Sequence, residues 1–273
     1  MVKRKSSKRV VNKITLETLE QIQKLSLMNN AFMNLALEGN IACVEEILRV
    51  ILNKSDLSVK TAQTQRMFQG FKRSIYLDIY AEDSKGILYN IEIQQANEGA
   101  DQRRARFHNG MIDVHALKAG QDFQELPECY VIFITLNDVL GLNKTIYTIH
   151  RYIDEQLELF NDGSHIIYVN CSAQDDGTEI WKLIHDLRCT KADEMYFPCL
   201  SARVKFLKED EKGVIIVSDY FENLQEKAAK EAQKKERETI ALQLLRLGKL
   251  TLEEIAKCSG LTLKKVRMLS STL

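Results

Sequence analysis

Two neighbouring segments, residues 75–80 and 87–94, alternate between apolar and polar side chains. Successive side chains of a β-strand point to opposite faces, so this alternation predicts two strands with one apolar face each. When such strands pair, their apolar faces must coincide, because a slip of one residue turns every side chain to the other side of the sheet. The matching register places Ile79 opposite Ile91.

The turn between the two strands agrees with this register. The register requires an odd number of connecting residues, such as Ser84-Lys85-Gly86. Gly86 can adopt the left-handed backbone conformation that three-residue hairpin loops favour. The same register places Asp78 opposite Glu92, with Cβ atoms about 5 Å apart. Gln94 points to the same face.

This polar group has two interpretations. The side chains of Asp78, Glu92 and Gln94 are either the solvated face of a half-exposed sheet or the ligands of a shared divalent cation. A hard cation such as Mg²⁺ takes carboxylate and carbonyl oxygens together with several waters. The residues alone leave both interpretations open.

The segments around the strand pair predict an α/β domain with a mixed sheet. Residues 41–52 carry apolar side chains three and four positions apart, as in a helix with one buried face. Residues 101–120 predict a second helix, and the apolar run 129–136 is typical of a strand buried on both faces. Residues 144–160 also predict a helix. Residues 59–95 contain three strand-like segments, the last two of which are the pair described above. The order from residue 41 is therefore helix, three strands, helix, strand, followed by further elements up to about residue 213.

The two ends of the chain differ from this domain. Residues 1–27 start with six basic side chains and continue as a helix-like segment, and residues 214–273 comprise a charged helix followed by two short helical segments. The central domain therefore spans residues 28–213. The last two helices predict either a hairpin that forms a homodimer or a helix-turn-helix that enters a DNA groove, and the short final helix favours the hairpin.

Composition excludes several classes of protein. Of the 273 residues, 45% are hydrophobic and 28% charged, which is typical of a folded chain. Basic and acidic residues number 38 each, so a polyanion site must be local. Six scattered cysteines predict reduced thiols in a cytoplasm, and no apolar run approaches the roughly 18 residues of a membrane-spanning helix. Phosphate-loop and G-x-S-x-G motifs are absent, which argues against an ATPase or a serine hydrolase.

A family resemblance rests on several ordered motifs. Asp78 followed by E92-I-Q94 resembles the E-x-Q form of the PD-(D/E)XK nuclease motif. The flanking segments MNNAFMNLALEGNIACVEEILRVIL, GADQRRARFHNGMIDVHALKAGQDFQELPECYVIFIT and NDGSHIIYVN extend the resemblance from about residue 28 to about residue 206. Together they are similar to the PD-(D/E)XK nuclease family transposases, relatives of the Rpn recombination-promoting nucleases.

The resemblance implies a restriction-endonuclease-like core, with the order αβββαβ, that cuts DNA with Mg²⁺, Mn²⁺ or Ca²⁺. It implies that Asp78 and Glu92 bind the metal and that Gln94 orients the attacking water where the commoner motif has lysine. A neutral amide cannot stabilise hydroxide by charge, so the metal must contribute more. Glu46, or its neighbour Glu45, is the candidate for a further metal ligand, although either can be an ordinary surface charge.

A basic cluster opens the helix that follows the strand pair. It comprises Arg103, Arg104, Arg106 and His108. Several guanidinium groups at a helix N-terminus suit phosphate, and the resemblance makes the DNA backbone their expected partner. The alternative is a solvated helix face whose arginines pair with nearby acidic residues.

The chain departs from the family pattern at one place. Relatives have an acidic pair ahead of an early phenylalanine, whereas this chain has Asn29 and Asn30 ahead of Phe32. This difference motivates a second hypothesis, a catalytically weakened DNA-binding or assembly protein that keeps the nuclease fold.

Overall fold

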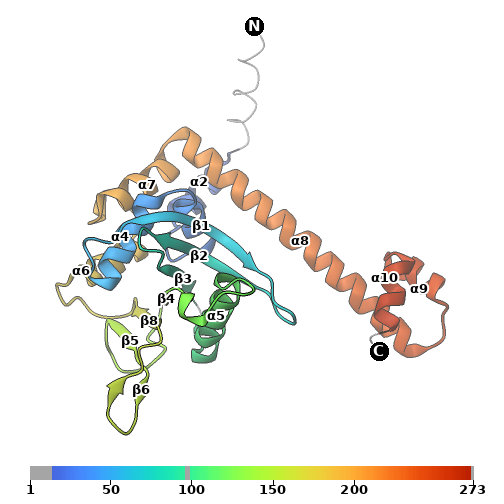
Figure 1. The fold of residues 1–273 in the computed structure, drawn as a ribbon. Helices are drawn as coiled ribbons and strands as arrows, with labels where there is room; N and C mark the ends of the chain where they lie inside the picture. Colours follow the sequence, from blue (N-terminus) through green and yellow to red (C-terminus); the bar gives the residue numbers. More distant parts are fainter. Residues whose placement is uncertain (1–13, 96–98, 272–273) are drawn as a thin grey trace. The chain divides into compact units, whose positions relative to one another are not determined.

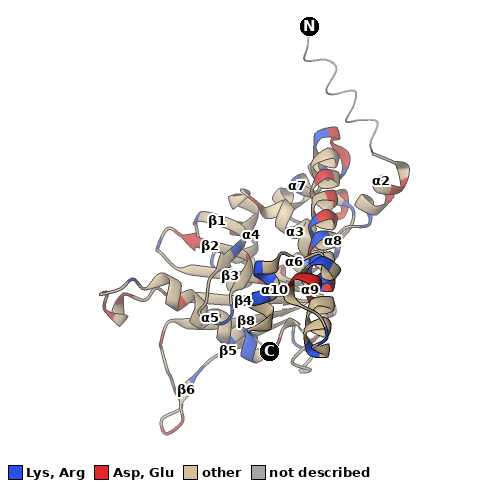
Figure 2. Ribbon diagram, turned by 90° about the vertical axis from the view of Figure 1, so that its right-hand side faces the viewer, with Lys and Arg blue, Asp and Glu red and all other residues tan. Residues whose placement is uncertain are grey.

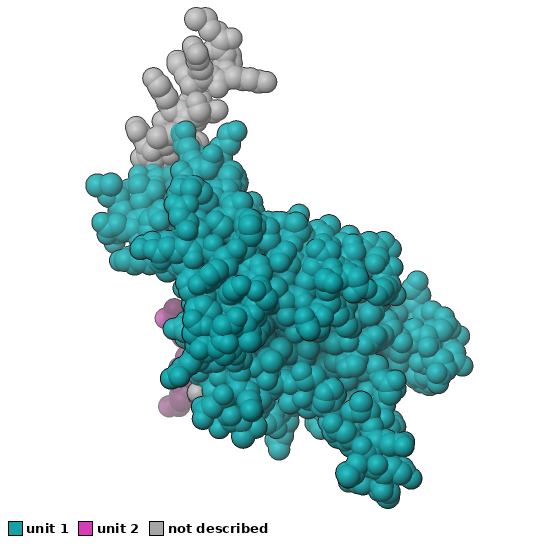
Figure 3. Space-filling view, turned by 90° about the vertical axis from the view of Figure 1, so that its left-hand side faces the viewer, with its two compact units in different colours: residues 1–218 teal, residues 219–273 magenta. Residues whose placement is uncertain are grey.

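The computed structural model describes residues 14–95 and 99–271, and the basic side chains at the start of the chain lie outside these ranges. The chain divides into two compact units, Met1–Ser218 and Asp219–Leu273. Figure 1 shows the elements and Figure 3 the two units.

A six-stranded mixed sheet in the order β1-β2-β3-β4-β8-β5 forms the centre of the first unit. Its strands are β1 (Val59–Phe68), β2 (Ile75–Asp83), β3 (Leu88–Gln94), β4 (Cys129–Thr135), β8 (Ser164–Asn170) and β5 (Ile146–Ile149). The first three pair antiparallel, β3, β4 and β8 pair parallel, and β5 is antiparallel to β8. The predicted α/β class with a mixed sheet is confirmed.

Helices precede, connect and follow the strands of this sheet (Figure 1). They are α2 (Leu16–Gln23), α3 (Asn30–Leu37), α4 (Ile41–Leu52), α5 (Gln102–Ala116), α6 (Glu179–Arg188), α7 (Pro198–Glu209) and the start of α8 (Glu211–Leu247), with short 3₁₀ turns at Phe123–Glu125 (η2) and Ala192–Glu194 (η3). Helix α4 contacts β1, α6 and α7, whereas α5 contacts β4 and β1. Every residue of β4 is buried, as its continuous apolar run predicts.

The hairpin of β2 and β3 has the predicted register, since Ile79 faces Ile91. Its loop closes through Gly86, which has a φ of 82° and donates its N–H to the Asp83 carbonyl at 3.1 Å. The Asp83 carboxylate accepts the Ile87 N–H at 2.9 Å, which fixes the turn from inside. Local alternation and turn chemistry were therefore sufficient to predict this hairpin.

The predicted helix over residues 144–160 is wrong. This segment forms β5 at the edge of the main sheet, followed by a separate pair of short strands, β6 (Tyr152–Ile153) and β7 (Glu158–Leu159). The β-branched residues of β5 favour an extended chain, and Ile146 pairs with Val169 of β8. The residues of this segment fit either a helix or a strand. Pairing with the edge of β8 stabilises the strand.

The second unit has a small core of its own. The C-terminal part of α8 packs with α9 (Leu252–Ser259) and α10 (Leu263–Ser270) around Ala241, Ile255 and Val266. Thr251 and Thr262 cap the two short helices, as their sequence positions predict. Acidic and basic residues are spread along α8 (Figure 2). No helix within the described residues is long and apolar enough to span a membrane.

Candidate active site

Asp78 and Glu92 lie where the backbone pairing of β2 with β3 ends and side-chain hydrogen bonds link the two strands. Strand pairing reaches Ile79 opposite Ile91, and Asp78 and Glu92 hold the next positions of that register. There the Asp78 N–H donates to Glu92 Oε1 at 3.2 Å, and the Ile93 N–H donates to Asp78 Oδ2 at 3.1 Å. Each carboxylate thus bridges to the backbone of the other strand.

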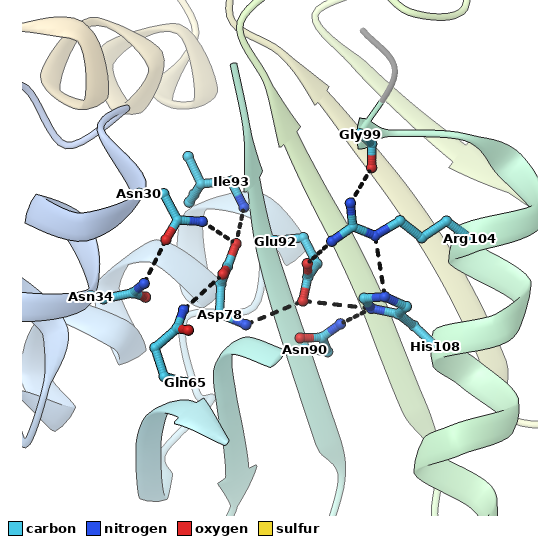
Figure 4. Close-up of polar contacts among 10 residues, drawn as sticks. All are labelled: Asn30, Asn34, Gln65, Asp78, Asn90, Glu92, Ile93, Gly99, Arg104 and His108. Carbon is cyan, nitrogen blue, oxygen red and sulfur yellow. Dashed lines mark hydrogen bonds and ion pairs between the residues drawn. The ribbon is translucent and has the colours of Figure 1, made fainter. Parts of the chain in front are cut away.

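The Asp78 carboxylate is held by uncharged donors (Figure 4). Asn30 Nδ2 donates to its Oδ2 at 2.7 Å, and Gln65 Nε2 donates to its Oδ1 at 3.0 Å. Asn30 is the first residue of α3, and its own Oδ1 accepts a hydrogen bond from Asn34 Nδ2 at 2.6 Å. The first turn of α3 therefore reaches the end of the strand pair. This long-range contact has no counterpart in the local sequence pattern.

Gln65 is a site residue that the sequence did not predict. It lies between two residues of β1 that pair with β2, Thr64 with Ile79 and Arg66 with Leu77, so it faces Asp78. Its φ of 51° is left-handed, a conformation that costs about 1–3 kcal/mol in a residue other than glycine. Strands rarely contain a residue with this backbone conformation, and the alternation of apolar and polar side chains does not predict it. The strained residue is the one whose side-chain amide donates to the Asp78 carboxylate.

The Glu92 carboxylate is fully buried and faces α5 (Figure 4). Arg104 Nη2 donates to Glu92 Oε2 at 3.1 Å, and His108 Nδ1 lies 3.5 Å from Oε1. Arg104 also donates to the Gly99 carbonyl at 2.9 Å and to His108 Nε2 at 3.3 Å. Because residues four apart lie on one face of a helix, Arg104 and His108 reach the same carboxylate.

Burial and charge shift both ionisable groups at this contact. Desolvation raises the pKa of Glu92 to about 8, the negative charge of Asp78 acts in the same direction, and Arg104 opposes both. Desolvation lowers the pKa of His108 to about 4, helped by the positive charges of Arg104 and Arg73. The imidazole is therefore neutral at pH 7. Arg104 donates to Nε2 of this ring, and its Nδ1 lies 3.1 Å from Asn90 Nδ2 and 3.5 Å from Glu92 Oε1.

The donor set fits a divalent cation. Mg²⁺ is usually held by one or two carboxylates, with waters and substrate phosphates completing its shell. Asp78 and Glu92 supply two opposed carboxylates, and a cation between them would relieve the repulsion and desolvation that raise the pKa of Glu92. Asn34 and Asn90 also have buried Oδ1 atoms without a hydrogen-bond partner. Within residues 14–95 and 99–271, no group of three His, Cys, Asp or Glu side chains has a metal-binding arrangement.

The other predicted site residues, Gln94, Glu46 and its neighbour Glu45, have contacts of their own. The side chain of Gln94 lies against Gly99, where an added Cβ would be 1.8 Å from Gln94 Oε1. Glu46 on α4 is close enough to Cys199 on α7 for its charge to act on that thiol. Glu45 pairs with Arg49 at 2.8 Å. None of these side chains has a contact with Asp78 or Glu92 among the described hydrogen bonds and ion pairs.

An open cleft of about 900 Å³ lies beside Asp78. The four predicted DNA-binding residues of α5 all line it, but they divide into two groups. Arg103 and Arg106 are exposed, whereas Arg104 and the buried His108 contact Glu92. Arg103 and Arg106 are therefore exposed to a ligand from solvent, whereas Arg104, although partly exposed, is held by Glu92.

The departure at Asn29 and Asn30 falls on the site itself. Asn29 caps α3, since its Oδ1 accepts the Phe32 N–H at 3.0 Å. Asn30 directly contacts the Asp78 carboxylate. An acidic residue at position 30 would therefore add a third carboxylate to the pair, whereas one at position 29 would remain a helix cap.

Comparison with known proteins gives one match. The family described as PD-(D/E)XK nuclease family transposase matches residues 38–183, more than half of the chain. No curated protein and no solved structure matches. The matched range contains both carboxylates and α5, whereas Asn30 precedes it.

Proposed function

The chain belongs to the PD-(D/E)XK nuclease family transposases, and on this premise we propose that it is a divalent-metal-dependent DNA endonuclease. The family implies nuclease chemistry on DNA in mobile elements. The finer proposal is that this chain hydrolyses internal phosphodiester bonds and that Asp78 and Glu92 hold the metal ion.

The opposed carboxylate pair beside a cleft lined with arginines carries the proposal. The negative charge of Asp78 acts on the fully buried Glu92 carboxylate and helps to raise its pKa, an effect that a bound cation would offset. Held by these two residues, Mg²⁺ or Mn²⁺ would supply Lewis-acid polarisation of the phosphate and activation of water. The family resemblance alone supports Gln94 as the residue that orients the attacking water and Glu46 as a further metal ligand.

The remaining side chains have distinct tasks. Arg103 and Arg106 bind the phosphates of the DNA backbone, because guanidinium groups match phosphate oxygens in charge and geometry. Arg104 holds the Glu92 carboxylate in place and offsets part of its charge. Neutral His108 packs against the same carboxylate, with its Nδ1 3.5 Å from Glu92 Oε1.

A second candidate function is a DNA-binding or assembly protein with weakened catalysis. Asn30 favours it, because a neutral amide stands beside Asp78 where a third carboxylate would strengthen metal binding. In this case the arginine-lined cleft still binds DNA, but the two carboxylates hold the metal too weakly for turnover.

Cleavage of supercoiled plasmid distinguishes the two candidates. Purified protein is incubated with plasmid in Mg²⁺, Mn²⁺, Ca²⁺ or EDTA, together with Asp78→Asn and Glu92→Gln. Asp56→Asn is the control, since Asp56 is exposed and pairs with Lys85 at 3.0 Å. We expect metal-dependent nicking by the wild type and the control, and a loss of about a hundredfold or more in both site variants. DNA binding without cleavage in any metal would favour the second candidate.

A further inference from the structure

Two exposed aromatic side chains line the cleft beside Asp78. Tyr76 of β2 is 58% exposed and Phe107 of α5 is 41% exposed. A single exposed aromatic residue needs no explanation, but two in one cleft form a candidate ligand surface. Neither ring contributes to holding Asp78 or Glu92, so the proposed metal chemistry does not account for them.

The two rings come from different elements that both carry active-site residues. Tyr76 precedes Asp78 by two residues on β2, so the two side chains point to the same face of the strand, with Cα atoms about 7 Å apart. Phe107 precedes His108 on α5 and lies one turn after Arg103. A ligand that enters the cleft toward Asp78 therefore meets an aromatic ring on the strand side and another on the helix side.

Three exposed arginines line the same cleft as these rings. Arg73, Arg103 and Arg106 line the cleft, and none has an ion-pair partner among residues 14–95 and 99–271. Asp101 also lines the cleft, but its Oδ1 caps α5 by accepting the Arg103 N–H at 2.6 Å. As far as the described residues show, the cleft thus offers positive charge without an ion-pair partner, together with exposed aromatic rings.

Positive charge and exposed rings together match one form of DNA better than another. Arginine binds phosphate in any strand, but an aromatic ring can stack only on a base whose face is accessible. In a continuous duplex each base face is covered by its neighbours, so the rings would gain little from it. An unpaired strand offers both phosphates and base faces.

We propose that the cleft binds DNA with unpaired bases, as a single strand or a locally opened duplex, and that Tyr76 and Phe107 stack on its bases. The proposal deepens the function given above and rests on it only in identifying the polyanion as DNA. The aromatic pair then selects the DNA structure, while Arg73, Arg103 and Arg106 hold its backbone.

Fluorescence anisotropy in EDTA tests the selection without cleavage. The probes are a labelled 30-nucleotide single strand, the same sequence as a continuous duplex, and that duplex with a central unpaired bubble. The variants are Tyr76→Ala, Phe107→Ala and Tyr76→Phe, which keeps the ring. Phe123→Ala is the matched control, because Phe123 is 78% exposed but lies in η2, outside the cleft.

The wild type should bind the single strand and the bubble at least about fivefold more tightly than the duplex. Each alanine variant should weaken single-strand binding by about 5- to 150-fold, the range for losing one stacked base, and change duplex binding far less. Tyr76→Phe and Phe123→Ala should bind as the wild type does. Equal wild-type affinity for single strand and duplex, or unchanged single-strand binding by both alanine variants, would overturn the proposal.

The outcome is separable from that of the plasmid assay. A ring-dependent preference for unpaired DNA, with no cleavage in any metal, would refute the endonuclease activity and support the binding proposal. Metal-dependent cleavage that is lost in Asp78→Asn, with no preference among the three probes, would support the endonuclease activity and refute the binding proposal.

Discussion

Changing Asn30 to aspartate tests the geometry of the carboxylate site more sharply than deleting a ligand does. In the wild type Asn30 Nδ2 donates to Asp78 Oδ2 at 2.7 Å. Asn30→Asp replaces this donor by a third carboxylate without changing the size of the side chain. We expect a less stable protein in the absence of metal and a stronger response to divalent cations.

The magnitude follows from this one contact. A hydrogen bond to a charged group contributes about 1.5–3 kcal/mol, and two carboxylates about 4 Å apart near a protein surface repel by up to about 4 kcal/mol. Relaxation of the partly exposed first turn of α3 reduces the sum, so we expect a loss of about 2–5 kcal/mol in EDTA. For a domain of this size that corresponds to a Tm lower by roughly 5–15 °C.

Thermal unfolding in EDTA and in rising Mn²⁺ or Ca²⁺ measures both effects. Asn29→Asp is the matched control, because it adds the same charge one residue away at a helix cap, where aspartate and asparagine are nearly equivalent. Asn30→Asp should melt below Asn29→Asp in EDTA and recover at a lower metal concentration than the wild type needs. Equal melting of the two variants in EDTA, or equal metal responses, would refute the assignment of Asn30 to the site.

The remaining predictions concern Gln65 and Glu92. Gln65→Gly and Gln65→Ala both remove the hydrogen bond to Asp78, but only glycine relieves the left-handed backbone, so urea unfolding should find Gln65→Gly the more stable by about 1 kcal/mol. The reverse order would show that residue 65 is unstrained. The pKa of Glu92 is raised from 4.5 in the unfolded chain to about 8 in the folded protein, so protonation of Glu92 stabilises the fold. This stabilisation is complete below pH 4.5 and is lost as the pH rises through 8. The Tm in EDTA should therefore fall between pH 5 and 8, and Glu92→Gln should flatten that fall, whereas parallel pH profiles would contradict the assigned pKa.

The sequence predicted those features that depend on the local pattern of one segment or of two neighbouring segments. Alternation in β2 and β3 predicted both the register and the opposition of Asp78 and Glu92, because only one register brings the apolar faces together. The left-handed Gly86 followed from the loop length. The burial of β4 followed from its unbroken apolar run.

Contacts between distant segments were outside the reach of the sequence pattern. Asn30 reaches Asp78 from α3, and Gln65 reaches it from β1 through a backbone conformation that side-chain alternation cannot reveal. Helical spacing groups Arg104 with His108, but only the packing of α5 decides that this face, and not that of Arg103, meets Glu92. The expected roles of Gln94 and Glu46 come from the motif alone and remain predictions.

Binding of Mn²⁺ in solution shows whether Asp78 and Glu92 form a metal site. Isothermal titration calorimetry compares the wild type with Asp78→Asn, Glu92→Gln and the exposed control Asp56→Asn. The account predicts one Mn²⁺ per chain in the wild type and the control, with affinity at least about tenfold lower in both site variants. Mn²⁺ binding that is unchanged by both site variants would contradict the assignment of Asp78 and Glu92 as the metal site.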